Sequence, residues 1–248
     1  MVFQRVLGVY AHPDDADVGA GASLARFAAQ GAEVTIVVAT LGDAGGYSAR
    51  DHERITEIRR QEQLDAAAAL GISHVVFLNG YRDGFLEPTA DLVRDVVAQI
   101  RTYRPDLVLT MNPEHNWDSV AASHPDHRAI GEATVRAIYP AARNPFAYPE
   151  LMEQGLEPWR VGEVWLQGHQ HPNFVNPVAQ CDVERKTKAV ACHFSQFEDV
   201  EKVLGFVCER ANAAGEKLRT EGRESGVPGA EGESARHPLG EEFLRYYA

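Results

Sequence analysis

Short runs of apolar, often β-branched residues alternate along the chain with longer amphipathic segments, and this alternation constrains the fold more than any other feature. We expect strands over residues 2–10, 33–40, 74–78, 106–111 and 161–167. We expect helices over residues 18–30, 52–70, 91–103, 181–193 and 198–214, with another that begins near His124. Buried strands separated by helices are typical of a parallel sheet that is covered on both faces. The sequence therefore predicts a Rossmann-like α/β fold with a mostly parallel sheet.

The length of 248 residues suits one domain of this class, and the chain shows no internal repeat and no clear linker. We therefore expect a single domain over residues 1–248. Residues 216–238 are rich in Gly, Glu, Arg and Ser and poor in apolar residues, which predicts a mobile loop. The tail EEFLRYYA regains aromatic and apolar character, so we expect it to dock onto the body of the domain.

The composition argues against several classes of partner. The formal net charge is −12 and no basic cluster is present, so no nucleic-acid partner is expected. Cys181, Cys192 and Cys208 form no CxxC pair, which argues against a disulfide framework and a thiolate zinc site. No apolar stretch approaches the ~20 residues of a membrane helix, and the N-terminal apolar run is too short for a signal peptide. We expect a cytoplasmic protein with no membrane partner.

Polar clusters follow the first and the fourth expected strand. The first strand ends in AHPDD, and the fourth leads through a long loop to HPDH. Ligands of open parallel sheets collect at the carboxyl ends of the strands. If these two strands are neighbours, as in common doubly wound orders, the two groups of His and Asp face each other.

Imidazole and carboxylate are the ligands of catalytic zinc, which commonly has three protein ligands and a water. Within each motif, residues three apart can point the same way in a turn or at a helix start. Asp14 lies between such positions and is free to act as a general base. Each motif alone could also be structural, as a strand end before a helix N-cap or as a helix start with Pro in its first turn. The presence of both at one sheet edge favours a catalytic metal site.

With these two motifs, the chain resembles the PIG-L/LmbE family of zinc-dependent N-deacetylases. The resemblance covers most of the chain and rests on AHPDD, TLGDAGG, ITEIRRQEQLDAAAALG, NGYRDG, HPDHRA and HFSQ. AHPDD and HPDH are specific when they occur together, whereas the other segments are individually weak. The resemblance implies that His12, Asp15 and His127 bind Zn²⁺ and that Asp14 is the general base.

The resemblance also implies roles for the rest of HPDH. His124 would help to stabilise the oxyanion, and Asp126 would hold or tune His124. The family usually has AHPDDE, whereas here Ala16 stands in place of the Glu and Asp17 follows it. This departure leaves the three implied ligands in place, and Asp17 is a candidate to replace the missing carboxylate.

Four further residues are candidates for binding substrate. Arg82 and Asp83 follow the third strand at the same sheet edge, and Trp117 lies in the long loop before HPDH, where its ring could stack on a sugar. The resemblance suggests a pocket role for His193 in HFSQ.

The function implied by the resemblance is hydrolytic removal of an acyl group, such as acetyl, from the amide nitrogen of a small substrate that contains an amino sugar. The expected partner is this N-acyl small molecule, and a homo-oligomer would agree with the frequent assembly of the family. An amidase for thiol-sugar conjugates or another biosynthetic amide, and a non-catalytic metal-binding relative, stay open as alternatives. A nucleotide-binding module is disfavoured, because the carboxylates of AHPDD occupy the phosphate turn and would repel a pyrophosphate.

Overall fold

In the computed structural model, which describes residues 3–46, 52–220 and 238–248, seven strands form one sheet in the order β3-β2-β1-β4-β5-β7-β6. The first five strands in this order run parallel: β3 (His74–Phe77), β2 (Glu33–Val38), β1 (Arg5–Tyr10), β4 (Leu107–Met111) and β5 (Glu163–Gln167). β7 (Leu239–Tyr247) pairs antiparallel with β5 and with β6 (Phe174–Val178). The predicted α/β fold with a mostly parallel sheet is confirmed.

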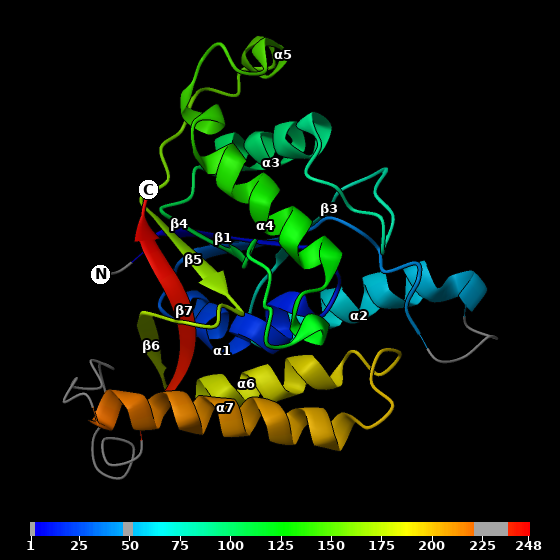
Figure 1. The fold of residues 1–248 in the computed structure, drawn as a ribbon, viewed down its shortest axis with the longest axis vertical. Helices are drawn as coiled ribbons and strands as arrows, with labels where there is room; N and C mark the ends of the chain where they lie inside the picture. The colour runs from blue at the N-terminus through cyan, green and yellow to red at the C-terminus, as the bar shows by residue number, and fades with distance from the viewer. Residues whose placement is uncertain (1–2, 47–51, 221–237) are drawn as a thin grey trace.

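Helices cover both faces of the sheet (Figure 1). α3 (Ala90–Tyr103) and α4 (Pro125–Ile138) pack together on one face. On the other face, α6 (Gln180–Ala191) packs on α1 (Asp15–Ala29) and α2 (Ile55–Leu70), and α7 (Val200–Thr220) packs on α6 and β7. The shorter elements are η1 (His52–Arg54), η2 (Val120–Ala122), η3 (Ala141–Arg143) and α5 (Pro149–Glu153). Within the described residues, no helix is both long and apolar enough to cross a membrane.

Local sequence signals determine where α4 begins, near the carboxyl edge of the sheet. The side chain of His124 caps α4 by accepting a hydrogen bond from the backbone N–H of Asp126, and Pro125 occupies the first turn. Proline suits this position because its fixed φ is helical and its missing N–H would have no partner there. HPDH is therefore both the start of a helix and the source of side chains at the sheet edge.

Three differences between the structure and the predicted elements concern the site, the sheet and the predicted loop. α1 begins at Asp15 instead of residue 18, so the AHPDD turn runs directly into the helix. β6 was not predicted, because FVNPV contains a proline and has no clear alternation of apolar and polar residues. The predicted mobile loop over residues 216–238 is wrong for 216–220, which form the last turn of α7, while residues 221–237 lie outside the described residues.

The docking of the C-terminal tail is confirmed in a specific form. β7 lies between β5 and β6, so the tail is an internal strand of the sheet. Glu241 of this strand is buried and accepts from the ammonium group of Lys186 on α6 at 2.7 Å. Glu241 also accepts from the backbone N–H groups of Ala22 and Ser23 in α1, which connects the tail to two helices.

Candidate active site

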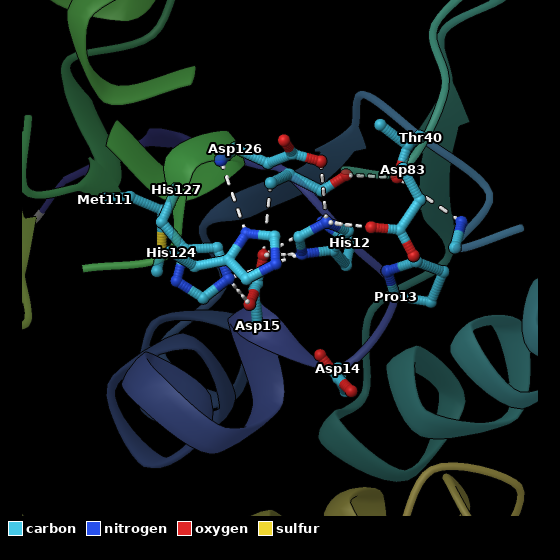
Figure 2. Close-up of polar contacts among 12 residues, drawn as sticks. His12, Pro13, Asp14, Asp15, Thr40, Asp83, Met111, His124, Asp126 and His127 are labelled. Carbon is cyan, nitrogen blue, oxygen red and sulfur yellow. Dashed lines mark hydrogen bonds and ion pairs between the residues drawn. The ribbon is translucent and has the colours of Figure 1, made fainter. Parts of the chain in front are cut away.

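The two polar motifs meet at the carboxyl ends of β1 and β4, which are neighbours in the sheet. AHPDD follows β1, and HPDH follows the loop after β4 and opens α4 (Figure 2). The strand order reverses between β1 and β4, since the chain continues to β2 on one side and to β5 on the other. Such a switch point is the usual position of a ligand site in doubly wound sheets. The expectation that the two motifs face each other is confirmed.

His12, Asp15 and His127 bring their ligand atoms to one point. His12 Nδ1 lies 3.3 Å from His127 Nε2, which lies 3.0 Å from Asp15 Oδ1, and Asp15 Oδ2 lies 3.6 Å from His12 Nδ1. In a tetrahedral zinc site with bonds of ~2.0–2.1 Å, the ligand atoms are ~3.4 Å from one another. The observed separations therefore fit three ligands of one divalent cation.

The second nitrogen of His12 is held by two carboxylates. Its Nε2 lies 3.0 Å from Asp83 Oδ1 and 3.1 Å from Asp126 Oδ2. When His12 carries one ring proton, these carboxylates favour it on Nε2 and leave the lone pair of Nδ1 facing Asp15 and His127. Burial lowers the pKa of His12, but hydrogen bonds to Asp126, Asp15 and Asp83 outweigh it and raise the pKa to about 12. The three carboxylates that surround His12 give the site a negative charge that suits a divalent cation.

Besides His12, Asp15 and His127, two further groups of three described side chains around His12 are close enough to hold a metal ion. One consists of His12, His124 and His127, and the other of His12, Asp83 and Asp126. The first lies on the Nδ1 side of His12, together with Asp15, and the second on the Nε2 side. The site thus offers a cation two positions, one on each side of a single imidazole.

The carboxylate of Asp126 forms its hydrogen bonds with groups other than His124, although its charge opposes the lowering of the pKa of His124 and so tunes that ring as the family resemblance suggested. The Asp126 carboxylate does not hold the ring of His124, but accepts from His12 and from the backbone N–H groups of Gly84 (2.7 Å) and Leu86 (3.2 Å). Only the backbone N–H of Asp126 contacts the His124 ring. The reason is its place in the first turn of α4, where the side chain meets the turn after β3. Asp126 therefore connects His12 to residues 84–86.

In its neutral form, with one ring proton, His124 can still donate a hydrogen bond. Its Nδ1 accepts from the backbone N–H of Asp126 at 3.3 Å, which leaves the ring proton on Nε2. Its ring centroid lies 5.0 Å from those of both His12 and His127. Burial and the neighbouring charges of His12 and His127 lower the pKa of His124, which favours the neutral ring.

Asp14 lies beside the three ligands in a backbone conformation that is rare for this residue type. Its φ is 104°, and its backbone N–H donates to Gln63 Oε1 at 3.0 Å. Figure 2 shows its carboxylate apart from the imidazole cluster. Burial, reinforced by the charge of Asp15, raises the pKa of Asp14 to about 6, although the charge of Arg59 opposes the shift. Such a carboxylate can accept a proton near neutral pH.

Arg59 supports the Asp14 turn. Its spacing from Glu62 along the helix favours an ion pair between the two side chains. Instead, Arg59 donates to Pro13 O (2.7 Å), Gly42 O (3.2 Å) and Asp14 Oδ2 (3.3 Å). Glu62 accepts from the N–H and the hydroxyl of Ser195, both at 2.8 Å. A Cβ on Gly42 would lie 2.0 Å from Arg59 Nη1, so this glycine lets the loop after β2 close over the guanidinium.

A sequence signal for these supporting residues did exist. Arg59, Glu62 and Gln63 recur at the helical spacing of Ala66 and Leu70, and all five are buried. Charged and amide side chains at the buried phase of a helix need polar partners from elsewhere in the fold. The pattern indicates that partners exist, but it does not say which segment supplies them.

The four substrate-binding candidates are in different surroundings. Asp83 is buried against His12, whereas Arg82 is exposed and its guanidinium lies 5.0 Å from the Phe85 ring centroid. Trp117 is 82% exposed and available to a ligand. His193 is fully buried and its Nε2 contacts Asp17 Oδ2 at 2.9 Å, so the structure differs from the expected pocket position.

Asp17 provides a buried carboxylate next to Ala16. Its side chain has no exposed surface and accepts from Gln63 Nε2 at 2.9 Å as well as from His193. Burial lowers the pKa of His193, but the hydrogen bond and charge of Asp17 outweigh this and raise it. Asp17 therefore engages α2 and the segment after α6, while its replacement of the family Glu stays a prediction.

Comparison with known proteins finds a family model and several relatives that match this chain. Residues 7–138 match the PIG-L family, described as GlcNAc-PI de-N-acetylase. A probable N-acetyl-α-D-glucosaminyl L-malate deacetylase 2 of Bacillus cereus is 32% identical over 79% of this chain and 84% of its own length. A 1D-myo-inositol 2-acetamido-2-deoxy-α-D-glucopyranoside deacetylase of Kineococcus radiotolerans is 33% identical over 65% of this chain, which spans about half (51%) of that relative.

A solved structure extends the similarity to nearly the whole chain. The N,N′-diacetylchitobiose deacetylase from Pyrococcus horikoshii, solved with its inhibitor MPG, superposes with a TM-score of 0.82. It is 28% identical, and the superposition covers 98% of this chain and 84% of that one. The likeness includes the C-terminal third, which lies beyond the matched residues 7–138.

Proposed function

This chain belongs to the PIG-L family, and from that premise we propose that it is a zinc-dependent N-deacetylase that hydrolyses the acetamide of a small amino-sugar substrate. The observation that carries the proposal is the convergence of His12, Asp15 and His127 at ligand distances, with Asp14 beside them. The relatives described above are deacetylases whose names specify acetylated amino sugars. The fold and the polar cluster would serve the same reaction here.

The three ligands would hold the cation through His12 Nδ1, His127 Nε2 and the Asp15 carboxylate. A bound Zn²⁺ supplies Lewis acidity, which polarises the amide carbonyl and makes water more acidic. Asp15 is fixed for this task, because its Oδ2 also accepts from the backbone N–H groups of Ala11 (3.2 Å) and His12 (2.8 Å). The end of β1 and the first residue of α1 are thereby held in one arrangement.

Asp14 and His124 would carry out the proton chemistry. Asp14 accepts a proton from the attacking water as the oxygen bonds to the amide carbon. His124, as the neutral tautomer with its proton on Nε2, donates a hydrogen bond to the carbonyl oxygen as negative charge develops there. When the C–N bond breaks, Asp14 returns the proton to the leaving nitrogen. The products are acetate and the free amino sugar.

Arg82 and Trp117 are proposed to contact the sugar outside the reacting amide. Both are exposed, and they lie in the loops that follow β3 and β4. The face of the Trp117 indole can stack on a sugar ring, and Arg82 can donate to hydroxyl oxygens. Asp126 is proposed to act by holding His12. The single domain, the cytoplasmic location and the homo-oligomer expected from the sequence stay predictions.

The proposal is tested by measuring acetate release and bound zinc in one preparation. Suitable substrates are N,N′-diacetylchitobiose, N-acetylglucosaminyl malate and N-acetylglucosaminyl inositol. We expect one Zn²⁺ per chain and turnover of at least one of them. Asp14→Ala should keep the metal and lose at least ~10²-fold in kcat, the lower end for a general base. His12→Ala should lose the metal as well.

The alternatives correspond to different outcomes of the same assay. Cleavage of the amide bond in cysteinyl conjugates of glucosamine, without acetate release from the acetylated sugars, would favour the amidase for thiol-sugar conjugates. Bound zinc without turnover of any acyl amine would favour the non-catalytic metal-binding relative. An Asp14→Ala variant with full activity would show that Asp14 is not the base.

A further inference from the structure

A chain of buried polar side chains leads from the Asp14 backbone to the segment after α6. The N–H of Asp14 donates to Gln63 Oε1 at 3.0 Å, and Gln63 Nε2 donates to Asp17 Oδ2 at 2.9 Å. The same Asp17 oxygen lies 2.9 Å from His193 Nε2. The side chains of Gln63, Asp17 and His193 are all fully buried. Three elements therefore contribute to one continuous connection: α1, α2 and the turn after α6.

This connection ends at Asp14, a residue of the AHPDD turn whose backbone conformation needs support from its surroundings. A φ of 104° is unfavourable for Asp14, and such a conformation persists only when its surroundings enforce it. The side chain of Asp14 makes no capping hydrogen bond to α1. Its N–H instead depends on the Gln63 amide, whose orientation is fixed by Asp17.

We propose that Gln63, Asp17 and His193 are positioning residues that hold Asp14 in the geometry of a general base. His193 thus acts through Asp17 and Gln63 and does not contact the substrate. The inference rests on the proposed deacetylase function, because it assigns a purpose to the base of that reaction.

The residues that follow His193 contact α2 and the loop after β2. Ser195 donates its N–H and its hydroxyl to Glu62, the neighbour of Gln63 in α2. Gln196 donates to the Ser195 hydroxyl, and its Oε1 would lie 2.5 Å from a Cβ on Gly45. The segment 193–196 is therefore packed between α2 and the loop after β2, which would keep the Gln63 amide in place.

The test compares Gln63→Leu with Gln61→Leu, both loaded with Zn²⁺ and assayed for acetate release from the best substrate of the panel above. Gln61 lies on the same helix but is exposed, where it donates to Asp65. We expect Gln63→Leu to lower kcat by about 10²-fold, the scale of a ~1 Å displacement of a reacting group. KM and zinc content should stay within about twofold, and Gln61→Leu should match the wild type.

Two further measurements keep the inference testable if a variant is unstable or the wild type is inactive. His193→Phe, which preserves a ring but removes both nitrogens, should lower kcat by about tenfold with unchanged zinc content. Amide hydrogen exchange at Asp14, followed by NMR, should accelerate at least about tenfold in Gln63→Leu and not in Gln61→Leu. This second readout does not need turnover, so it separates a failure of the deacetylase proposal from a failure of the positioning proposal.

The inference is overturned if folded, zinc-loaded Gln63→Leu retains wild-type kcat, or if its loss of activity is explained by loss of metal. It is also overturned if exchange at Asp14 is unchanged. A loss expressed only in KM would assign Gln63 to substrate binding instead.

Discussion

Two arginines are almost completely buried in the part of the chain that the structure describes, and their surroundings differ sharply. Arg101 on α3 is 1% exposed and Arg59 on α2 is 3% exposed. All hydrogen bonds of Arg101 in the described structure go to main-chain carbonyl oxygens, which belong to Ala141, Ala142, Asn144, Ala147 and Leu156 at 2.8–3.4 Å. Arg59 also binds two carbonyl oxygens, but it faces the carboxylates of Asp14 at 3.3 Å and Asp83 at 3.8 Å.

The difference teaches what each guanidinium does. Arg101 holds the irregular segment from η3 to α5 together through the fixed fork of donors on its guanidinium. Burial lowers the pKa of Arg101 because no described carboxylate pairs with it directly. Arg59 joins the turn after β1 to the loop after β2 and lowers the pKa of Asp14. The first arrangement serves stability, and the second serves a site in which charges must stay balanced.

Arg101→Met should produce the largest effect on stability. Five carbonyl oxygens would lose their donor, so we expect the free energy of unfolding to fall by about 3 kcal/mol. Because none of the residues that Arg101 contacts belongs to the site, kcat/KM of the folded enzyme should stay within about twofold. Urea denaturation and steady-state kinetics on the same sample check both parts. A large fall in kcat/KM with normal stability would remove the distinction between the two arginines.

Arg59→Met should show the opposite pattern. We expect kcat/KM to fall by at least about tenfold, because Asp14 loses the positive charge beside it and the Pro13 carbonyl loses its donor. Stability should fall less than in Arg101→Met, since two carbonyl oxygens lose their donor instead of five. Kinetics at saturating zinc and denaturation of both variants in parallel provide the measurement. Equal kinetic losses in the two variants would contradict the comparison.

The pH dependence of stability should separate the two regions further. The pKa of His193 is raised in the folded protein, mainly through Asp17, so its ion pair stabilises the fold below the ordinary His pKa of ~6.5. This contribution is lost as the pH rises through the raised value. The stability deficit of His193→Gln should therefore shrink with increasing pH, whereas that of Arg101→Met should stay constant between pH 6 and 8, because arginine does not titrate there. Denaturation curves over this range check it, and a flat His193→Gln deficit would count against the ion pair.

A third arginine gives the smallest expected effect and serves as the control. Arg136 lies on the exposed side of α4 and donates to Glu132 at 2.7 Å. Solvent screens such pairs, so Arg136→Ala should change the free energy of unfolding by less than ~0.5 kcal/mol and leave kcat/KM unchanged. A larger change would show that arginine burial is a poor guide to importance in this protein.

The sequence was sufficient for the parts of the site that follow strand ends. The position of AHPDD after one apolar strand and of HPDH after another placed both motifs at one edge, and the adjacency of β1 and β4 brought them together. The partners of Asp126 were not accessible in this way, because Gly84 and Leu86 come from a turn distant in the chain.

The supporting contacts illustrate a second limit. The buried phase of α2 indicates that Arg59 and Gln63 need partners, but only the packing of α2 against the Asp14 turn selects them. For the same reason the strand β6 was missed: its pairing with the C-terminal β7, and not its own residue pattern, makes it a strand. Local patterns define elements and their ends, whereas long-range pairing decides which polar groups meet.

The central claim is that one divalent cation binds on the Nδ1 side of His12. It is tested most directly by anomalous scattering at the zinc edge from a crystal of the zinc-loaded protein. We predict a single peak within ~2.0–2.2 Å of His12 Nδ1, His127 Nε2 and an Asp15 carboxylate oxygen. A peak on the Nε2 side of His12, between Asp83 and Asp126, or no peak near His12 at full zinc loading, would contradict the account.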